Sequence, residues 1–208
     1  STNQYCREMY WDKSIGAPVK NIQNDLYQKK ALQLEKFISN KKKDFEDYYK
    51  IRCEKADVYW MGFDNFPEYE SLKKCFMNRI KGTSFQNNGD KRIYMITCLE
   101  EYEKKTVGFV QLSITKDGIE IGYSVIEKYQ GQKIGTIALS LSVEIGLRIS
   151  DKIYVEIWEN NIASQTIAKK NGFVGNRSTL VSDRTIGGEN RYRVYWYSPD
   201  SNSKKFVE

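Results

Sequence analysis

One stretch of the chain, residues 119–170, limits the possible folds more than any other. Residues 119–126 alternate in polarity as a β-strand does, and a glycine-containing turn leads from them into a long amphipathic helix over residues 134–149. A second strand over residues 152–158 and a short helix over residues 162–170 follow. Strand, helix, strand and helix in direct succession predict an α/β fold around a mixed sheet.

Further strands are expected on both sides of this stretch. Residues 92–99 and 107–115 are rich in β-formers, and Asp117-Gly118 is a strong hairpin signal that connects the second run to the next strand. Residues 191–197 are predicted as a late strand. Apolar residues at helical spacing predict a helix over residues 69–80. The hairpins supply the antiparallel part of the sheet.

The N-terminal part of the chain is unlike the rest. Residues 24–43 carry apolar side chains at roughly helical spacing and are predicted as a helix, whereas residues 48–54 are predicted as the first strand of the main domain. We therefore expect a mainly helical N-terminal extension over residues 1–47 and an α/β domain over residues 48–208. The extension is a packing element, an interaction arm or part of a substrate lid.

Composition removes several classes of protein. The chain has 208 residues, of which 40% are apolar and 29% charged, as in ordinary soluble domains. No apolar run approaches the ~18 residues of a membrane span, so we expect no membrane contact. The four cysteines lie far apart without a disulfide-like framework, so we expect a reduced, cytoplasmic protein. There is no histidine, and the four cysteines lack CxxC spacing, which excludes histidine-based catalysis and argues against a metal site. The net charge of +6 is dispersed, which argues against a nucleic-acid partner.

The turn before residue 134 is a candidate anion site. A strand that ends, a glycine-containing turn and a helix N-terminus together present backbone N–H groups and partial positive charge. Gly131 and Gly135 allow close approach of the backbone, and Lys133 adds a mobile positive charge. The turn matches neither the phosphate-loop nor the dinucleotide glycine pattern, and an ordinary strand-to-helix turn explains it equally well.

A second cluster follows one strand later. It has the pattern N-x-x-S-x-x-x-x-x-K-x-G-F, made by Asn161, Ser164, Lys170, Gly172 and Phe173. With the Gln130-x-x-Lys133-x-Gly135 turn, this stretch resembles the GNAT acetyltransferase superfamily, and in particular the branch of the ribosomal-protein N-terminal acetyltransferases. Three further segments match that branch: Ile51-Arg52, Val107-Gly108-Phe109 and Ile121-Gly122-Tyr123. The resemblance spans about residues 48–198 and leaves residues 1–47 unexplained.

The resemblance implies a GNAT-like acyl-CoA N-acyltransferase fold with acetyl-CoA as co-substrate and no metal. The turn would hold the pyrophosphate, the end of the preceding strand and Asn161 would contact the pantetheine arm, and Ser164 would stabilise or protonate the leaving thiolate. Asn161 is also a favoured helix N-cap, which is compatible with this role. The cofactor-binding residues so implied are Val125, Ile126, Gln130, Gly131, Gln132, Lys133, Ile134, Gly135, Thr136, Asn161 and Ser164.

Two positions depart from the superfamily pattern. Lys133 stands where most members have glycine, and Ala168 stands where many members have the tyrosine that protonates the thiolate. The second departure is shared with the branch named above and makes Ser164 the expected catalytic group. Lys170, Gly172 and Phe173 are expected to be structural.

An acceptor amine must lose a proton, and without histidine a carboxylate is the expected base. We predict Glu120 as the catalytic base, because it lies within a strand on which superfamily members often carry one, with Glu156 on the next strand as the alternative. Tyr123 and Tyr129 are further acid or water-holding candidates. Five aromatic residues line an acceptor cleft or fill the core: Trp60, Phe63, Trp158, Tyr195 and Trp196.

The expected function is therefore acetyl-CoA-dependent transfer of an acetyl group to a primary amine by direct attack. The acceptor is a small molecule or a peptide: a protein N-terminus, an amino sugar or aminoglycoside, a polyamine or an amino acid. The alternative is a catalytically weak or silent acyl-CoA-binding module that acts through its N-terminal arm. A homodimer is compatible with either function.

Overall fold

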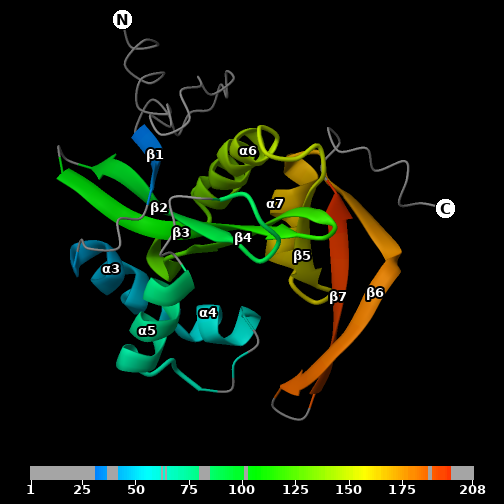
Figure 1. The fold of residues 1–208 in the computed structure, drawn as a ribbon, viewed down its shortest axis with the longest axis horizontal. Coiled ribbons are helices and arrows are strands. Elements are labelled where there is room, and N and C mark those ends of the chain that lie inside the picture. Colours follow the sequence, from blue (N-terminus) through cyan, green and yellow to red (C-terminus); the bar gives the residue numbers. More distant parts are fainter. Residues whose placement is uncertain are drawn as a thin grey trace, which may run out of the picture.

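The computed structural model describes residues 31–36, 42–61, 63, 65–79, 85–100, 103–186 and 189–197. Seven strands form one sheet with the order β1-β2-β3-β4-β5-β7-β6 (Figure 1). All neighbouring strands are antiparallel except β4 and β5, which are parallel. The predicted mixed sheet is thus confirmed. The strands are β1 (Ala31–Lys36), β2 (Lys91–Glu100), β3 (Glu103–Thr115), β4 (Gly118–Val125), β5 (Ile153–Trp158), β6 (Val174–Ile186) and β7 (Glu189–Tyr197).

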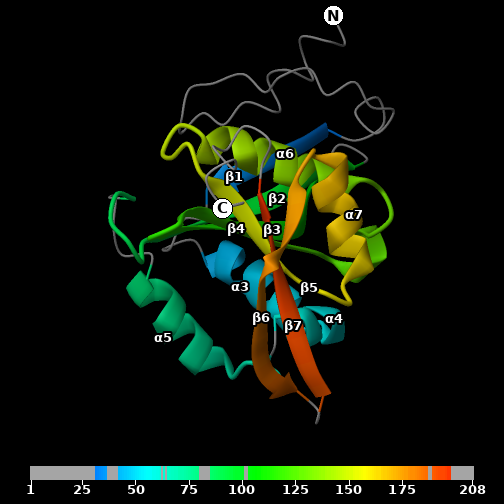
Figure 2. The ribbon, with the colours of Figure 1, turned by 90° about the vertical axis from the view of Figure 1, so that its right-hand side faces the viewer.

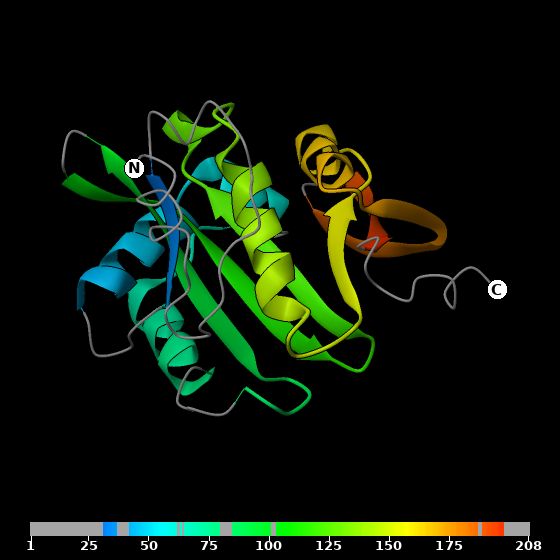
Figure 3. The same cartoon turned by 90° about the horizontal axis from the view of Figure 1, so that it is seen from above.

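Helices cover both faces of the sheet (Figures 1 and 3). On one face lie α6 (Ile134–Gly146) and α7 (Ile162–Lys170), and on the other lie α3 (Lys42–Arg52), α4 (Lys55–Trp60) and α5 (Tyr69–Arg79). Figure 2 shows β6 and β7 as a long twisted pair at the sheet edge. Within the described residues, no helix is long and apolar enough to cross a membrane.

Alternation along β2 divides the core into two clusters. Tyr94 and Ile96 belong to the larger cluster, which includes the buried face of α6, whereas Ile93 and Met95 belong to a smaller cluster. The smaller cluster contains three residues of α3, Phe45, Tyr48 and Ile51, which recur every three positions along one helix face. Each large apolar side chain buried in this way contributes about 1.5–3 kcal/mol to folding. Both faces of the sheet are therefore held by hydrophobic packing.

The parallel strands β4 and β5 pair at one end only. The pairs are Ile119 with Ile153 and Glu120 with Tyr154, although both strands are described throughout and β4 continues to Val125. Beyond Glu120 the two strands separate. The sheet therefore opens in its middle, on the side where β4 leads into α6 and β5 leads into α7 (Figure 3).

Several predicted elements are confirmed: the strands near residues 92–99, 107–115, 119–126, 152–158 and 191–197, and the helices near residues 69–80 and 162–170. The helix predicted over residues 134–149 ends at Gly146, where a Cβ would lie 2.7 Å from the Cδ1 of Ile153. The strand β6 was not predicted.

The N-terminal predictions are wrong in two places. Residues 31–36 form a strand that pairs with β2, within the stretch predicted as a helix; the rest of that stretch up to residue 41 lies outside the described residues. Residues 48–52 are helical rather than extended, because the three-residue spacing of Phe45, Tyr48 and Ile51 buries one helix face. The predicted domain boundary at residue 47 falls inside α3, where the secondary structure has no break. The boundary therefore stays a prediction.

Candidate active site

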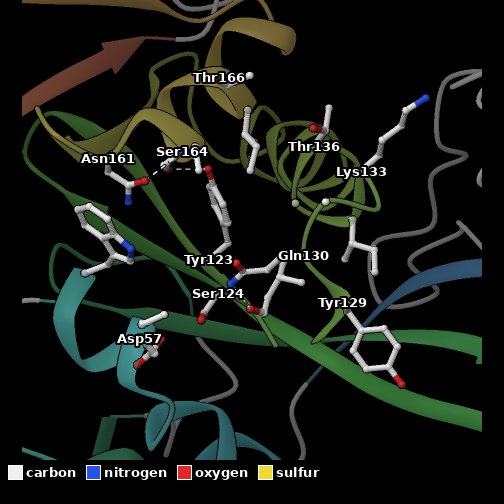
Figure 4. Close-up of a pocket in the computed structure, with 18 of the residues that line it drawn as sticks. Asp57, Tyr123, Ser124, Tyr129, Gln130, Lys133, Thr136, Asn161, Ser164 and Thr166 are labelled. Atoms are coloured by element: carbon white, nitrogen blue, oxygen red, sulfur yellow. Dashed lines mark hydrogen bonds between the residues drawn. The ribbon is translucent and has the colours of Figure 1, made fainter. Parts of the chain in front are cut away.

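A pocket of about 440 Å³ opens where β4 and β5 separate (Figure 4). Its walls come from the end of β4, the turn into α6, α7 with the residue before it, and α4 with the residues that flank it. These elements lie far apart in the sequence. The lining residues are Glu54, Ala56, Asp57, Trp60, Met61, Tyr123, Ser124, Val125, Tyr129, Gln130, Gly131, Lys133, Ile134, Gly135, Thr136, Asn161, Ala163, Ser164, Thr166, Ile167 and Lys170.

The turn into α6 has the geometry of an anion site. Gly131 and Lys133 both have positive φ, at 74° and 64°, which aims successive backbone amides to one side. Lys133 is the N-cap residue of α6, its side chain makes no capping hydrogen bond, and the first turn contains no acidic residue. The N–H groups of a first helical turn have no acceptor within the helix. This end of the pocket therefore suits a phosphate-bearing ligand.

The helices α6 and α7 are in close contact beside this turn. A Cβ on Gly135 would lie 2.8 Å from the Cδ1 of Ile167, so a larger residue there forces the end of the Ile167 side chain to move. The side-chain amide of Asn171, which follows α7, donates to the backbone oxygen of Thr136 at 3.0 Å. The anion site and α7 are thus held in a fixed relation.

Asn161 and Ser164 lie at the start of α7. The Asn161 carboxamide oxygen accepts from the backbone N–H of Ser164 at 3.0 Å, so the N-cap role is confirmed. The Ser164 hydroxyl lies 2.8 Å from the hydroxyl of Tyr123 on β4. Burial raises the pKa of Tyr123 to about 12, although the hydrogen bond with Ser164 acts in the opposite direction. Tyr123 therefore keeps its proton at neutral pH and can share it with Ser164.

The side of the pocket formed by α4 and the residue before it carries two carboxylates. Asp57 on α4 is buried, and its Oδ2 accepts from Arg52 Nη1 at 2.6 Å. Burial raises the pKa of the Asp57 carboxyl, whereas Arg52 and the nearby Ser124 hydroxyl lower it. Burial also raises the pKa of Glu54, whose Oε2 accepts from the backbone N–H of Glu127 at 3.0 Å.

Aromatic residues connect α4 to β5. The Trp158 indole donates to the backbone oxygen of Trp60 at 2.7 Å, and the Trp60 side chain lines the pocket. Phe63 is exposed and lies with its ring 5.2 Å from the Arg52 guanidinium carbon, outside the pocket lining. The side chains of Tyr195 and Trp196 lie outside the described part of the chain.

The structure brings most of the predicted site residues together. Nine of them line the pocket: Val125, Gln130, Gly131, Lys133, Ile134, Gly135, Thr136, Asn161 and Ser164. Ile126 and Gln132 belong to the same turn but are not among the lining residues.

Glu120, predicted as the base, does not line the pocket either. Its Oε2 lies 3.5 Å from the Tyr154 hydroxyl near the paired end of β4 and β5. Glu156 is also outside the lining. A base at Glu120 or Glu156 stays a prediction. Sequence reasoning missed Glu54 and Asp57; a helix assigned from residue 55 onward would have made Glu54 its N-cap residue and placed Asp57 in its first turn.

Comparison with known proteins agrees with the family resemblance of the sequence. The acetyltransferase (GNAT) domain family matches residues 32–174, so the chain belongs to the GNAT acetyltransferase family. This match confirms the predicted superfamily and begins at β1 rather than at residue 48. No curated protein sequence matches the chain.

Two solved structures illustrate the shared fold. A spermidine N-acetyltransferase from Vibrio cholerae, in complex with CoA and spermine, is 16% identical with a TM-score of 0.65, covering 85% of this chain and 98% of that one. A domain from Methanocaldococcus jannaschii is 20% identical with a TM-score of 0.59, covering 80% and 99%. The GNAT-like acyl-CoA N-acyltransferase fold is therefore confirmed.

Proposed function

We propose that this N-acetyltransferase takes its acetyl group from acetyl-CoA and transfers it to a small primary amine in the pocket between β4 and β5. The observation that carries the proposal is the joining of an anion-binding turn and a hydroxyl pair in one pocket. Acetyl-CoA, when bound, supplies an activated thioester.

The turn from Gln130 to Thr136 would bind the pyrophosphate of the cofactor. Its backbone amides and the uncapped N-terminus of α6 provide donors, and Lys133 and Lys170 line the same end of the pocket. The unpaired edge of β4 at Val125 and the side chain of Asn161 lie toward the pocket centre, where the pantetheine arm would extend. This arrangement fits a ligand with one anionic end and one extended neutral arm.

Ser164 and Tyr123 would act on the leaving group. Transfer to an amine would form a C–N bond and break the C–S bond of the thioester. The nitrogen would lose one proton, to a carboxylate directly or through water, and the departing thiolate would need one. The Ser164 hydroxyl would donate it and recover one from Tyr123, 2.8 Å away. Tyr123 thus supplies from β4 the phenol that Ala168 lacks on α7. The 2.8 Å contact between the two hydroxyls supports this assignment, and the raised pKa of Tyr123 keeps the phenol protonated before the thiolate departs.

A small cationic amine suits the acidic end of the pocket. Spermidine is the first acceptor to test, because a relative of similar fold is a spermidine N-acetyltransferase. A peptide with a free N-terminus is the second, because Asn161 to Phe173 resembles the ribosomal-protein N-terminal acetyltransferases. The resemblance to that branch remains a proposal.

A thermal-shift measurement tests cofactor binding first. Acetyl-CoA at about 100 times its dissociation constant should stabilise the fold by about 2.7 kcal/mol, which is several degrees. Gly135→Leu should abolish the shift, because the new side chain meets Ile167. Gly122→Ala is the matched control, since a Cβ on Gly122 has no atom within 4 Å.

Release of CoA in the presence of amines tests the reaction itself. Spermidine, an aminoglycoside and a short peptide should each be compared with water alone. Acceleration by any amine supports transfer. Binding of acetyl-CoA without acceleration by any of the three would favour the alternative, a catalytically silent acyl-CoA-binding module, and absence of binding would end the acetyl-CoA proposal.

A further inference from the structure

Asp57 has an unused hydrogen-bonding atom at the acidic end of the pocket. Its side chain is only 2% exposed and its Oδ2 accepts from Arg52, whereas its Oδ1 has no partner in hydrogen-bond geometry, although the Ser124 hydroxyl lies close enough to lower the pKa of the carboxyl. A buried acceptor without a donor is unfavourable by about 1–3 kcal/mol, and more when it is charged. Because Asp57 lines the pocket, a ligand that brings an N–H group can satisfy this oxygen.

The surroundings favour a positive donor over a neutral one. Glu54 lines the pocket three residues before Asp57. The two carboxylates together make the electrostatic potential there more negative. Arg52 compensates one of the charges, but it is not a lining residue and its guanidinium is covered by the Phe63 ring. Two carboxylates against one guanidinium leave a net charge of −1 beside the pocket.

Apolar side chains line the pocket together with the two carboxylates. Ala56, Trp60 and Met61 of the α4 segment line the same region of the pocket. Figure 4 shows Ser124 between Asp57 and Tyr123, at the end of β4. A donor held at Asp57 is thus separated from the Tyr123–Ser164 pair by the width of this strand end.

We propose that Asp57, assisted by Glu54, binds the ammonium group of the acceptor and makes the pocket specific for a primary alkylammonium over an uncharged analogue. The ammonium donates to Asp57 Oδ1, and the alkyl chain lies against Trp60 and Met61. This inference rests on the proposed function, because it names the substrate class of the same pocket. It makes Asp57 a specificity-determining residue.

The test compares two probes of equal shape, n-hexylamine and 1-hexanol. Their dissociation constants are measured by calorimetry on the full chain with saturating CoA, so that no turnover is needed. The unmodified protein should bind the amine at least about ten-fold tighter than the alcohol, since a hydrogen bond to a charged group is worth that much or more. Asp57→Asn should bring the ratio to within about three-fold of unity while the dissociation constant of CoA stays unchanged.

The matched control is Asp151→Asn, an exposed carboxylate outside the pocket, which should keep the ratio of the unmodified protein. An equal affinity for amine and alcohol in the unmodified protein overturns the proposal, as does an unchanged ratio in Asp57→Asn. If Asp57→Asn does not fold, Glu54→Gln carries the test, because it leaves the Arg52 pair intact; it should lower the ratio two- to five-fold, and an unchanged ratio overturns the proposal.

Failure of the proposed function is distinguishable from failure of this inference. If acetyl-CoA does not bind the unmodified protein, the proposed function fails. If CoA binds as expected and the amine is not preferred, only the assignment of Asp57 fails.

Discussion

The two ends of the pocket present different kinds of chemical group. At the end beside α6 the binding groups are backbone amides, shaped by the left-handed residues Gly131 and Lys133, with lysine side chains around them. At the end beside α4 they are the carboxylates of Glu54 and Asp57. We therefore expect one end to select negative charge through main-chain geometry and the other to select positive charge through side chains.

This difference predicts how each end responds to substitution. Changes in the turn act through backbone conformation, so their effects on stability and on binding can be separated. Changes near α4 act through a buried charge pair, so stability and specificity change together. The predictions below test this contrast, beginning with the largest effect.

Asp57→Ala should give the largest loss of stability. It leaves Arg52 charged and without its partner in a buried position, which costs about 3–5 kcal/mol. Urea unfolding followed by circular dichroism measures the loss. The double variant Arg52→Met, Asp57→Leu should recover most of it, because apolar residues often replace a buried ion pair without penalty. A double variant as unstable as Asp57→Ala would show that packing rather than charge is responsible.

Ser164→Ala should lower kcat by about 100-fold or more, the effect typical of losing a general acid. The dissociation constant of acetyl-CoA should change little, because in the proposed mode of binding the backbone turn makes the main contacts. Tyr123→Phe should give a smaller loss of kcat, since Ser164 keeps its hydroxyl and can exchange protons with water. Steady-state kinetics with both substrates varied separate the two constants, and equal kcat in Ser164→Ala would remove Ser164 from the reaction.

Lys133→Gly should separate stability from binding at the cofactor end. A non-glycine residue at φ 64° is strained by about 1–2 kcal/mol, partly offset by the greater chain entropy of glycine, so we expect a gain of up to about 1 kcal/mol. Affinity for CoA should fall, because the lysine charge is lost. Lys169→Gly on α7 cannot serve as a control, because glycine would disrupt that helix. Lys133→Asn isolates the effect of the lysine charge, since asparagine tolerates the left-handed region.

The pH dependence of stability should show the smallest effect. Because the pKa of Asp57 is raised in the folded state, the folded protein keeps the Asp57 proton at pH values above the ordinary pKa of 3.8, where the unfolded chain has lost it. Stability contributed by this proton is present at low pH and is lost as pH rises through the folded pKa. The difference in unfolding free energy between the unmodified protein and Asp57→Asn, measured from pH 3 upward in urea, should follow this direction. A difference independent of pH would contradict the raised pKa.

Sequence reasoning was most successful where the site is local. The turn, Asn161 and Ser164 lie on consecutive elements, and glycine positions and helix caps mark such elements clearly. The Tyr123–Ser164 contact joins residues 41 positions apart, and only the fold shows which strand faces which helix. Glu54 and Asp57 were missed because Tyr48, Tyr49 and Ile51 favour a strand by composition, whereas their spacing favours a helix.

The opening between β4 and β5 places a strand edge inside the molecule. Strand edges at a surface are templates for pairing with other chains and favour aggregation. Here α4, α6 and α7 border the opening, and the Gln130 side chain already donates to the backbone oxygen of Val125 at 3.0 Å. A thin, extended molecule can therefore approach this edge of β4. A polypeptide strand that would pair with the edge along its whole length is excluded by the surrounding helices.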